Sequence, residues 1–481
     1  MKKKILVIVS AVVGVLLVAG GIVAYLYLKP PTQEEIDTYN GLVAEGDLLL
    51  EAHEYSEAVN KYNSAIKVIR IETTAYSRIV DIYLLKNDFE TAMEVAQQAQ
   101  NSASSAEGIS LIYADIAEAY WDDEDYYNAK INYEVASALD ANPIVNLRLA
   151  KSYVYDSEFD SARNLLSGDY DFETVDEAKL LYAYILGAED IDEAQEFLSE
   201  YTVTDAEMSS YFEEYSSILD SLTDDELFNI TKLSRIYINN GYSALAIKLL
   251  EPKIEDIDQY IDALYFLGKA YLDVGQYDQS IEILLKAASL LGYESDKYWM
   301  LARAYYFKND LVSAMTYYDM SVEYVGDDIT RDLVEEYLNV LLDSNQTIKA
   351  QDVYADVVDS IESEWLYLIG LELYYNQSDV KFDYYLNKLA DMDMNDSWTK
   401  EYLFWKIRKD LDDSKLDDVE EDLENLLELD RFNSQYYWMK GVYEISLSED
   451  EAAKDSFELA LEYDLGGITT EEVEKLLAEL E

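Results

Sequence analysis

The stretch ALYFLGKAYLDVGQYDQSIEILLKAA (residues 263–288) carries the apolar pattern of a pair of short helices. The pattern recurs along the chain, and Tyr237, Tyr271 and Tyr305 stand 34 residues apart. A fixed period of this length is typical of helical repeat arrays, in which no repeat buries its apolar face alone and stacking supplies the core. The sequence therefore predicts an all-α solenoid.

The pattern resembles that of the tetratricopeptide repeat (TPR) family. Small residues in that family let helix A and helix B of one repeat approach closely, and larger apolar residues fill the space against the next repeat. The matching residues are Gly46, Leu49, Tyr55, Ala58, Tyr62 and Ala65 near the N-terminus; Ala117, Tyr120, Tyr126, Ala129, Tyr133 and Ala136; Gly268, Tyr271, Tyr277, Ser280, Leu284 and Ala287; and Gly441, Ala453, Phe457 and Ala460 near the C-terminus.

The resemblance implies a right-handed superhelical TPR-like α-solenoid of about twelve helix-turn-helix repeats. Spacing between alanines on either side of residues 204–222 exceeds one period by roughly one helix, so we expect an extra helix and a junction there. This junction would separate an N-terminal arm (39–203) from a C-terminal arm (223–466). The final residues, 467–481, look like the polar capping helix that terminal repeats need.

The N-terminus has the pattern of a membrane anchor. Three lysines within residues 1–4 precede an uncharged run at 5–28, and a short linker follows at 29–38. A helix over that run would be about 36 Å long, enough to cross a bilayer core of about 30 Å. A cleaved signal peptide is the alternative, although its apolar region is shorter. The lysines predict a single-pass protein with a cytoplasmic N-terminus and an extracytoplasmic solenoid.

Composition excludes several functional classes. The net charge is −63, which disfavours nucleic acid and anionic lipid as partners of the solenoid. The chain has no cysteine, so disulfides, thiolate catalysis and cysteine-ligated metals are excluded. Its one histidine, His53, cannot form a histidine metal site alone. No phosphate loop or nucleophile elbow is present, and we expect neither enzymatic activity nor a cofactor.

A candidate peptide-binding groove lies in residues 231–307. The TPR resemblance places three basic residues, 34 apart, on helix A facing the groove, with aromatic neighbours that could hold side chains while the cations meet carboxylates. The alternative is local pairing, for example of Lys269 with Asp273 one turn on. The predicted groove residues are Arg235, Tyr265, Lys269, Trp299, Arg303 and Tyr306.

A second motif is DMDMNDSWTKEY at 391–402, whose alternating Asp391, Asp393 and Asn395 resemble an EF-hand calcium loop. It departs from that loop at two decisive positions, because Asp396 replaces the turn glycine and Tyr402 the final glutamate. We therefore interpret it as an inter-repeat turn whose Asp or Asn caps the next helix.

The TPR resemblance implies a scaffold that binds protein or peptide partners, including acidic or C-terminal segments, in a cell-envelope, secretion or surface assembly. Two other functions stay open at this point. One is a surface structural or adhesive protein whose acidic face binds divalent cations. The other is an accessory subunit that recruits an enzyme.

Overall fold

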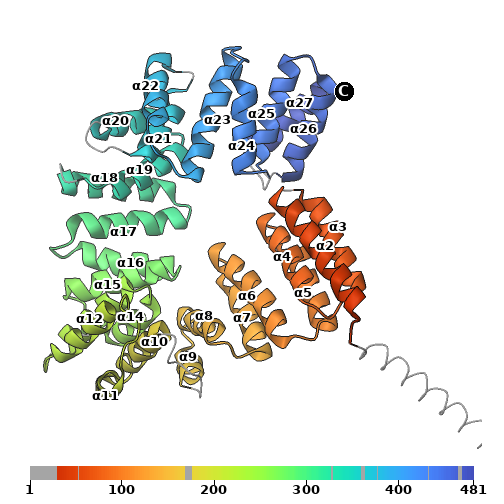
Figure 1. Ribbon diagram of the computed structural model, residues 1–481. Coiled ribbons are helices and arrows are strands. Elements are labelled where there is room, and N and C mark those ends of the chain that lie inside the picture. Colours follow the sequence, from red (N-terminus) through yellow and green to blue (C-terminus); the bar gives the residue numbers. More distant parts are fainter. Residues whose placement is uncertain are drawn as a thin grey trace, which may run out of the picture. The chain divides into compact units, whose positions relative to one another are not determined.

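The computed structural model describes residues 30–52, 54–167, 176–326, 329–358, 363–375, 377–431, 433–463 and 468–480. These residues form 26 α-helices and one 3₁₀ turn, and they contain no strand (Figure 1). Most consecutive helices among the described residues contact each other, and the contacts are most extensive within the helix pairs, as expected for short helices joined by short turns. The prediction of an all-helical, TPR-like array of helix pairs is confirmed for this part of the chain.

The contacts divide the chain into two compact units, the first ending at Tyr153 and the second comprising the described residues from Val154 onward. The predicted arms at 39–203 and 223–466 were drawn from repeat spacing and stay a prediction. The first unit contains α2 (Gln33–Glu51), α3 (Tyr55–Val68), α4 (Thr74–Leu85), α5 (Phe89–Ser102), α6 (Ala106–Asp122), α7 (Tyr126–Leu139) and most of α8 (Pro143–Tyr155).

The second unit continues the pairing to the C-terminus. Its helices are α9 (Phe159–Leu166), α10 (Asp176–Gly187), α11 (Ile191–Glu200), α12 (Ser209–Asp220), α13 (Glu226–Asn239), α14 (Ser243–Leu250), η2 (Glu251–Lys253), α15 (Ile261–Asp273), α16 (Tyr277–Ala288), α17 (Glu294–Phe307), α18 (Leu311–Val325), α19 (Arg331–Asp343), α20 (Thr347–Val357), α21 (Glu364–Tyr374), α22 (Asp379–Ala390), α23 (Asp396–Asp412), α24 (Val419–Leu429), α25 (Ser434–Ser446), α26 (Asp450–Tyr463) and α27 (Ile468–Leu480).

The turn inside a helix pair is set by one residue in the left-handed conformation. Asn87 and Asn309 have φ of 54° and 60°, and each is followed by an aspartate that caps the second helix of its pair. Gly275, with φ of 74°, serves the same turn between α15 and α16. Asparagine and glycine adopt this conformation at the lowest cost, which explains their place at these turns.

Close approach of the two helices in a pair explains the small residues of the repeat pattern. A Cβ atom added to Gly268 on α15 would lie 2.5 Å from Cγ of Leu284 on α16. The same addition to Gly46 on α2 would meet the ring of Tyr62 on α3 at 2.5 Å. Only glycine allows this interhelical distance without repacking.

Helix α12 lies between α11 and α13 in the sequence, within the segment 204–222 where an extra helix is predicted. Its Tyr215 is fully buried, and its hydroxyl donates to the carbonyl oxygen of Ala183 on α10 at 3.3 Å. That hydroxyl also lies 3.1 Å from the hydroxyl of Tyr237 on α13. Because one side chain contacts both helices, α12 is packed into the unit between α10 and α13.

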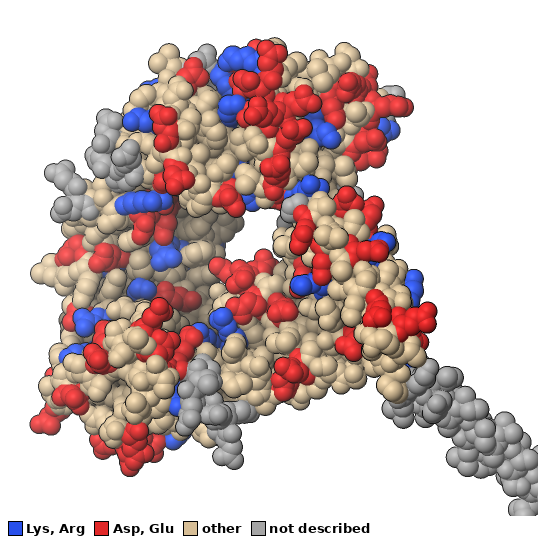
Figure 2. Space-filling view, in the orientation of Figure 1, with Lys and Arg blue, Asp and Glu red and all other residues tan. Residues whose placement is uncertain are grey.

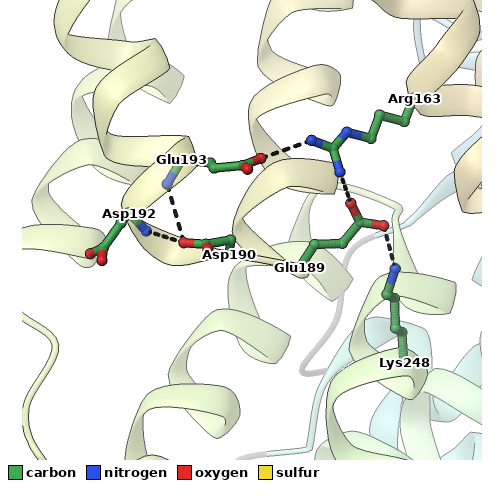
Figure 3. Close-up of polar contacts among 6 residues, drawn as sticks. All are labelled: Arg163, Glu189, Asp190, Asp192, Glu193 and Lys248. Atoms are coloured by element: carbon green, nitrogen blue, oxygen red, sulfur yellow. Dashed lines mark hydrogen bonds and ion pairs between the residues drawn. The ribbon is translucent and has the colours of Figure 1, made fainter.

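An ion-pair network joins helices on both sides of α12 in the sequence. Glu189, in the turn after α10, accepts from Arg163 of α9 at 2.6 Å and from Lys248 of α14 at 2.8 Å (Figure 3). Arg163 also pairs with Glu193 of α11 at 2.8 Å. The Glu189 side chain is 19% exposed, and those of Arg163 and Lys248 are 35% and 27% exposed, so the pairs are still partly open to water. The network fixes α14 against the α10–α11 turn.

Among the described residues, no helix combines the length and the apolarity that a bilayer span requires. The predicted transmembrane run at 5–28 and the cytoplasmic segment at 1–4 lie outside the described residues, as does His53. The predicted capping helix falls on α27, which packs against α25 and α26.

Candidate functional site

Four successive A helices of the second unit, α13, α15, α17 and α19, carry or border the predicted groove residues. Helix α15 contacts both α13 and α17. Two side-chain bonds then connect α17 with α19, from Trp299 to Glu336 and from Tyr306 to Asp343. The A helices therefore lie side by side, and we call the surface that bears Arg235, Lys269 and Arg303 the A-helix face.

Arg235 is the exposed cation of this face. It makes no ion pair within the part of the chain that the structure describes, and its charge acts on the nearby Tyr293 hydroxyl. Burial and the bond to Asp262 outweigh that charge and raise the pKa of Tyr293. The Tyr293 ring stacks on Tyr265 with a centroid distance of 4.5 Å. Tyr265 is buried and packs against the Tyr293 ring.

Lys269 is engaged within its own helix. Its Nζ lies 3.3 Å from Oδ2 of Asp273, one turn further along α15. The same carboxylate oxygen accepts from the Ser243 hydroxyl on α14 at 2.7 Å. The local pairing considered as an alternative for Lys269 is confirmed.

Arg303 is engaged with a residue of the next repeat. Glu336 Oε2 on α19 lies 3.4 Å from Nε of Arg303, and the same oxygen accepts from the Trp299 indole at 2.6 Å and from the Tyr318 hydroxyl at 3.1 Å. Burial and the charge of Glu336 raise the pKa of Tyr318, so its hydroxyl stays protonated and donates. One carboxylate thus organises three donors from α17 and α18.

A small cavity opens beside this cluster, with a volume of about 130 Å³. It brings together Arg303 and Tyr306 with three residues that sequence reasoning missed: Tyr318, Glu336 and Asn339. Tyr306 reaches across to Asp343 through a hydrogen bond of 2.9 Å. The lining offers a cation, hydroxyl groups and an amide, which suits it to hold a polar segment of polypeptide. The complete lining is Arg303, Tyr306, Phe307, Tyr318, Glu336, Asn339 and Val340.

The corresponding A helices of the first unit carry acids. Asp47 and Asp81 are both paired with Arg78, at 3.2 Å and 3.5 Å. Asp115 has no ion pair among the described residues. Desolvation of its carboxyl group by neighbouring protein atoms, together with the negative charges of Asp81 and Glu118, raises its pKa to about 6. A face of this charge suits basic rather than acidic partners.

The loop at 391–395 serves as a helix cap. Asn395 Oδ1 accepts from the backbone N–H of Trp398 at 2.9 Å and so begins α23. This confirms the capping interpretation of the DMDMND motif. Within the described ranges, no cluster of three or more histidine, cysteine or acidic residues has the arrangement of a metal site.

Comparison with known proteins gives one family match. Residues 261–290, which are α15 and α16, match the tetratricopeptide repeat model. The match places the Lys269–Asp273 pair on the A helix of a TPR motif. No curated protein matches the sequence.

Several solved structures are similar over most of their length but superpose poorly. The Cut9–Hcn1 heterotetramer of the APC/C is 11% identical with a TM-score of 0.37, covering 95% of this chain and 98% of that one. Naa15/Naa10 bound to HypK is 13% identical with a TM-score of 0.34, covering 92% and 90%. Yeast Tom70 is 14% identical with a TM-score of 0.33, covering 93% and 95%. Similarity at this level carries no conclusion about partners.

Proposed function

We propose that this chain is a membrane-tethered, extracytoplasmic scaffold whose A-helix face binds protein partners, and that it has no catalytic activity of its own. The observation that carries the proposal is the run of cations and aromatic side chains on consecutive A helices of the second unit, ending in the cavity between Arg303 and Asn339. The TPR motif at 261–290 lies within this run, and TPR motifs serve protein–protein interaction.

Acidic or C-terminal segments are the partners that this face fits. Arg235 is exposed and carries no carboxylate partner among the described residues. Lys269 and Arg303 are paired, but their side chains remain 29% and 32% exposed. Pairs of this exposure contribute at most about 1 kcal/mol, so an incoming carboxylate can replace Asp273 or Glu336 at low cost.

The tether is proposed from the uncharged run at 5–28 and the lysines before it, which favour a cytoplasmic N-terminus. A scaffold held outside the cytoplasm in this way would serve a cell-envelope, secretion or surface assembly. Recruitment of an enzyme by the same face would be one form of this function.

The experiment is partner capture from membranes of cells that produce the full chain, by crosslinking and identification of the neighbours. The test variant combines Arg235→Glu, Lys269→Glu and Arg303→Glu. The matched control combines Lys286→Glu, Lys349→Glu and Lys415→Glu, which make the same charge change at exposed positions away from the A-helix face. We expect the test variant to lose a specific set of neighbours and the control to retain it.

Unchanged capture by the test variant would refute the proposed binding face. The same membranes report on the tether, because protease added outside intact cells should cleave the solenoid while alkaline washing leaves the chain in the membrane. Release of the chain by alkaline washing, or protection from the protease, would overturn the tether or its orientation.

A further inference from the structure

A second cavity lies on the A helices further along the same unit, between α21 and α23. These two helices contact each other directly, and the cavity between them has a volume of about 150 Å³. Drug-sized ligands occupy pockets of roughly 300–1,000 Å³, so this cavity has the size for a single side chain. Its lining is Trp365, Leu368, Ile369, Glu372, Ser397, Trp398, Glu401 and Trp405.

Indole rings form much of the wall. Trp365 comes from α21, and Trp398 and Trp405 come from the first and third turns of α23. The whole chain has 6 tryptophans, so half of them meet at this point. Indole is the aromatic ring that attracts cations most strongly.

Two carboxylates complete the cavity, Glu372 from α21 and Glu401 from α23. Both are exposed to solvent, and neither forms an ion pair within the described ranges. Desolvation by neighbouring protein atoms, together with the negative charges of Glu401 and Asp343, raises the pKa of Glu372. Desolvation also raises the pKa of Glu401, while a hydrogen bond with Trp405 opposes that shift. Each acid would therefore be stabilised by a cation placed between them.

The neighbouring turn of α23 already holds a cation on aromatic rings. The Arg408 guanidinium lies 4.9 Å from the ring centroid of Tyr375, 5.4 Å from that of Trp438 and 5.9 Å from that of Trp405. Trp405 thus contributes both to this resident cation–π cluster and to the cavity. The same packing of A helices accommodates a cation against indole within the chain itself.

We propose that the cavity formed by Trp365, Trp398, Trp405, Glu372 and Glu401 binds the ammonium group of a lysine side chain presented by a partner protein. The four-carbon lysine stem packs against the indole rings, and its three N–H donors reach carboxylates on two different helices. A guanidinium is planar and is suited to one bidentate carboxylate, so it fits two separated acids less well. The surrounding negative charge of the chain brings such a partner to the surface.

This site is separate from residues 235–307 and from the tether, so either proposal can fail while the other stands. The test measures the tryptophan fluorescence of the full chain during titration with a capped glycine–serine peptide that carries one lysine, at physiological salt. Parallel titrations use the same peptide with Nε-acetyl-lysine, the same peptide with arginine, and free choline.

The decisive variant is Glu372→Gln with Glu401→Gln, which removes both charges and keeps the shape of the side chains. Its control is Glu420→Gln with Glu421→Gln on α24, two exposed acids whose removal changes the net charge equally. We expect the cavity variant and the acetylated peptide each to weaken binding by about tenfold or more, equivalent to about 1.4 kcal/mol. The control should bind the lysine peptide as the natural chain does.

Four results would each overturn the proposal. Absence of a saturable response to the lysine peptide would remove the site, and an equal loss in the control would reduce it to the general field of an acidic chain. Equal binding of the arginine peptide would refute the lysine assignment. Equal binding of choline would make it a small-molecule site. A thermal unfolding scan of both variants checks that the fold is intact.

Discussion

In α2 and α6 of the first unit the residue that follows the small A-helix residue is acidic, whereas in α13, α15 and α17 of the second unit it is basic. Asp47 follows Gly46, and Glu118 follows Ala117. Their counterparts in the second unit include Lys269 after Gly268. The position is the same and the helix pair is built alike, so the backbone does not determine the charge of this surface. Charge is the feature in which the two faces differ.

The difference changes how buried tyrosines are satisfied. The hydroxyls of Tyr62 and Tyr133 donate to Asp47 and Glu118, which lie 15 residues earlier in the same helix pair. In the second unit Tyr318 has Arg303 at that position, and its hydroxyl donates instead to Glu336 of the next repeat. A buried hydroxyl without an acceptor is costly, and with Arg303 at this position the acceptor for Tyr318 comes from the neighbouring repeat. The Tyr318 hydroxyl therefore couples its repeat to the next one, whereas in the first unit Asp47 reaches the next repeat through its own ion pair with Arg78.

The largest effect that separates the two units should come from the small residue itself. Gly46→Ala places Cβ at 2.5 Å from the ring of Tyr62, which is fully buried and fixed by its bond to Asp47. Gly268→Ala places Cβ at 2.5 Å from Leu284, which can change its rotamer. We expect about 2–3 kcal/mol of local destabilisation for Gly46→Ala and about 1 kcal/mol for Gly268→Ala.

Hydrogen exchange of the amides of α2–α3 and α15–α16 measures both changes locally, as an array of repeats requires. Gly41→Ala is the control, because no atom lies within 4 Å of its added Cβ, and it should stabilise α2 by up to about 1 kcal/mol. Equal effects of Gly46→Ala and Gly268→Ala would show that the stiffness of the opposing side chain is irrelevant.

An intermediate effect should follow from removing one tyrosine hydroxyl in each unit. Tyr133→Phe and Tyr318→Phe should each cost about 1 kcal/mol, the usual contribution of one hydrogen bond. The two substitutions should raise amide exchange in different sets of helices. Tyr133→Phe should raise it within α6 and α7 alone. Tyr318→Phe weakens the link to Glu336 and should raise exchange in α19 as well. Exchange confined to α17 and α18 after Tyr318→Phe would contradict the coupling between repeats.

The smallest effect concerns the pH dependence of the acidic face. The pKa of Asp115 is about 6 in the folded chain, above the ordinary value of 3.8, so the folded state holds its proton more tightly. Ionisation of Asp115 therefore opposes folding: the cost is absent below about pH 4, grows as pH rises and is complete above about pH 6. Asp115→Asn should stabilise α6 at pH 7 by a few tenths of a kcal/mol after solvent screening, and by nothing at pH 4.

Amide exchange of α6 at the two pH values tests this, with the natural chain as reference. Stabilisation of the same size at pH 4 would assign the effect to helix propensity rather than to charge.

The sequence was enough to predict the helix pairs, the close approach at Gly46 and Gly268, and the pairing of Lys269 with Asp273, because each depends on residues within one repeat. The contacts that Glu336 makes with the preceding repeat were not predicted. The distance from Trp299 to Glu336 is 37 residues, as is that from Tyr306 to Asp343, so the period lengthens here and a fixed step of 34 misses both contacts. Searching for acids at 37 residues from each aromatic would have found them.

The pocket of Trp365, Trp398 and Trp405 was missed for a related reason. Residues 331–430 depart from the repeat pattern, so their helical positions could not be assigned to a face from the sequence. Local hydrogen bonds were easier to predict from the sequence. Asn395 was recognised as a helix cap because capping depends on a few adjacent residues.

By itself the sequence determined that this chain is an array of helix pairs with small residues at several crossings, because a repeated spacing encodes local geometry. It also set the sign of charge on each A helix. Only the tertiary structure decided which acids those cations and hydroxyls contact, since Glu336 serves Trp299, Arg303 and Tyr318 from the next repeat. The tertiary structure likewise decided which acids have no ion-pair partner among the described residues. Glu372 and Glu401 line one cavity only because α21 packs on α23. Partners far apart in sequence are brought together by packing, and packing depends on all the helices at once.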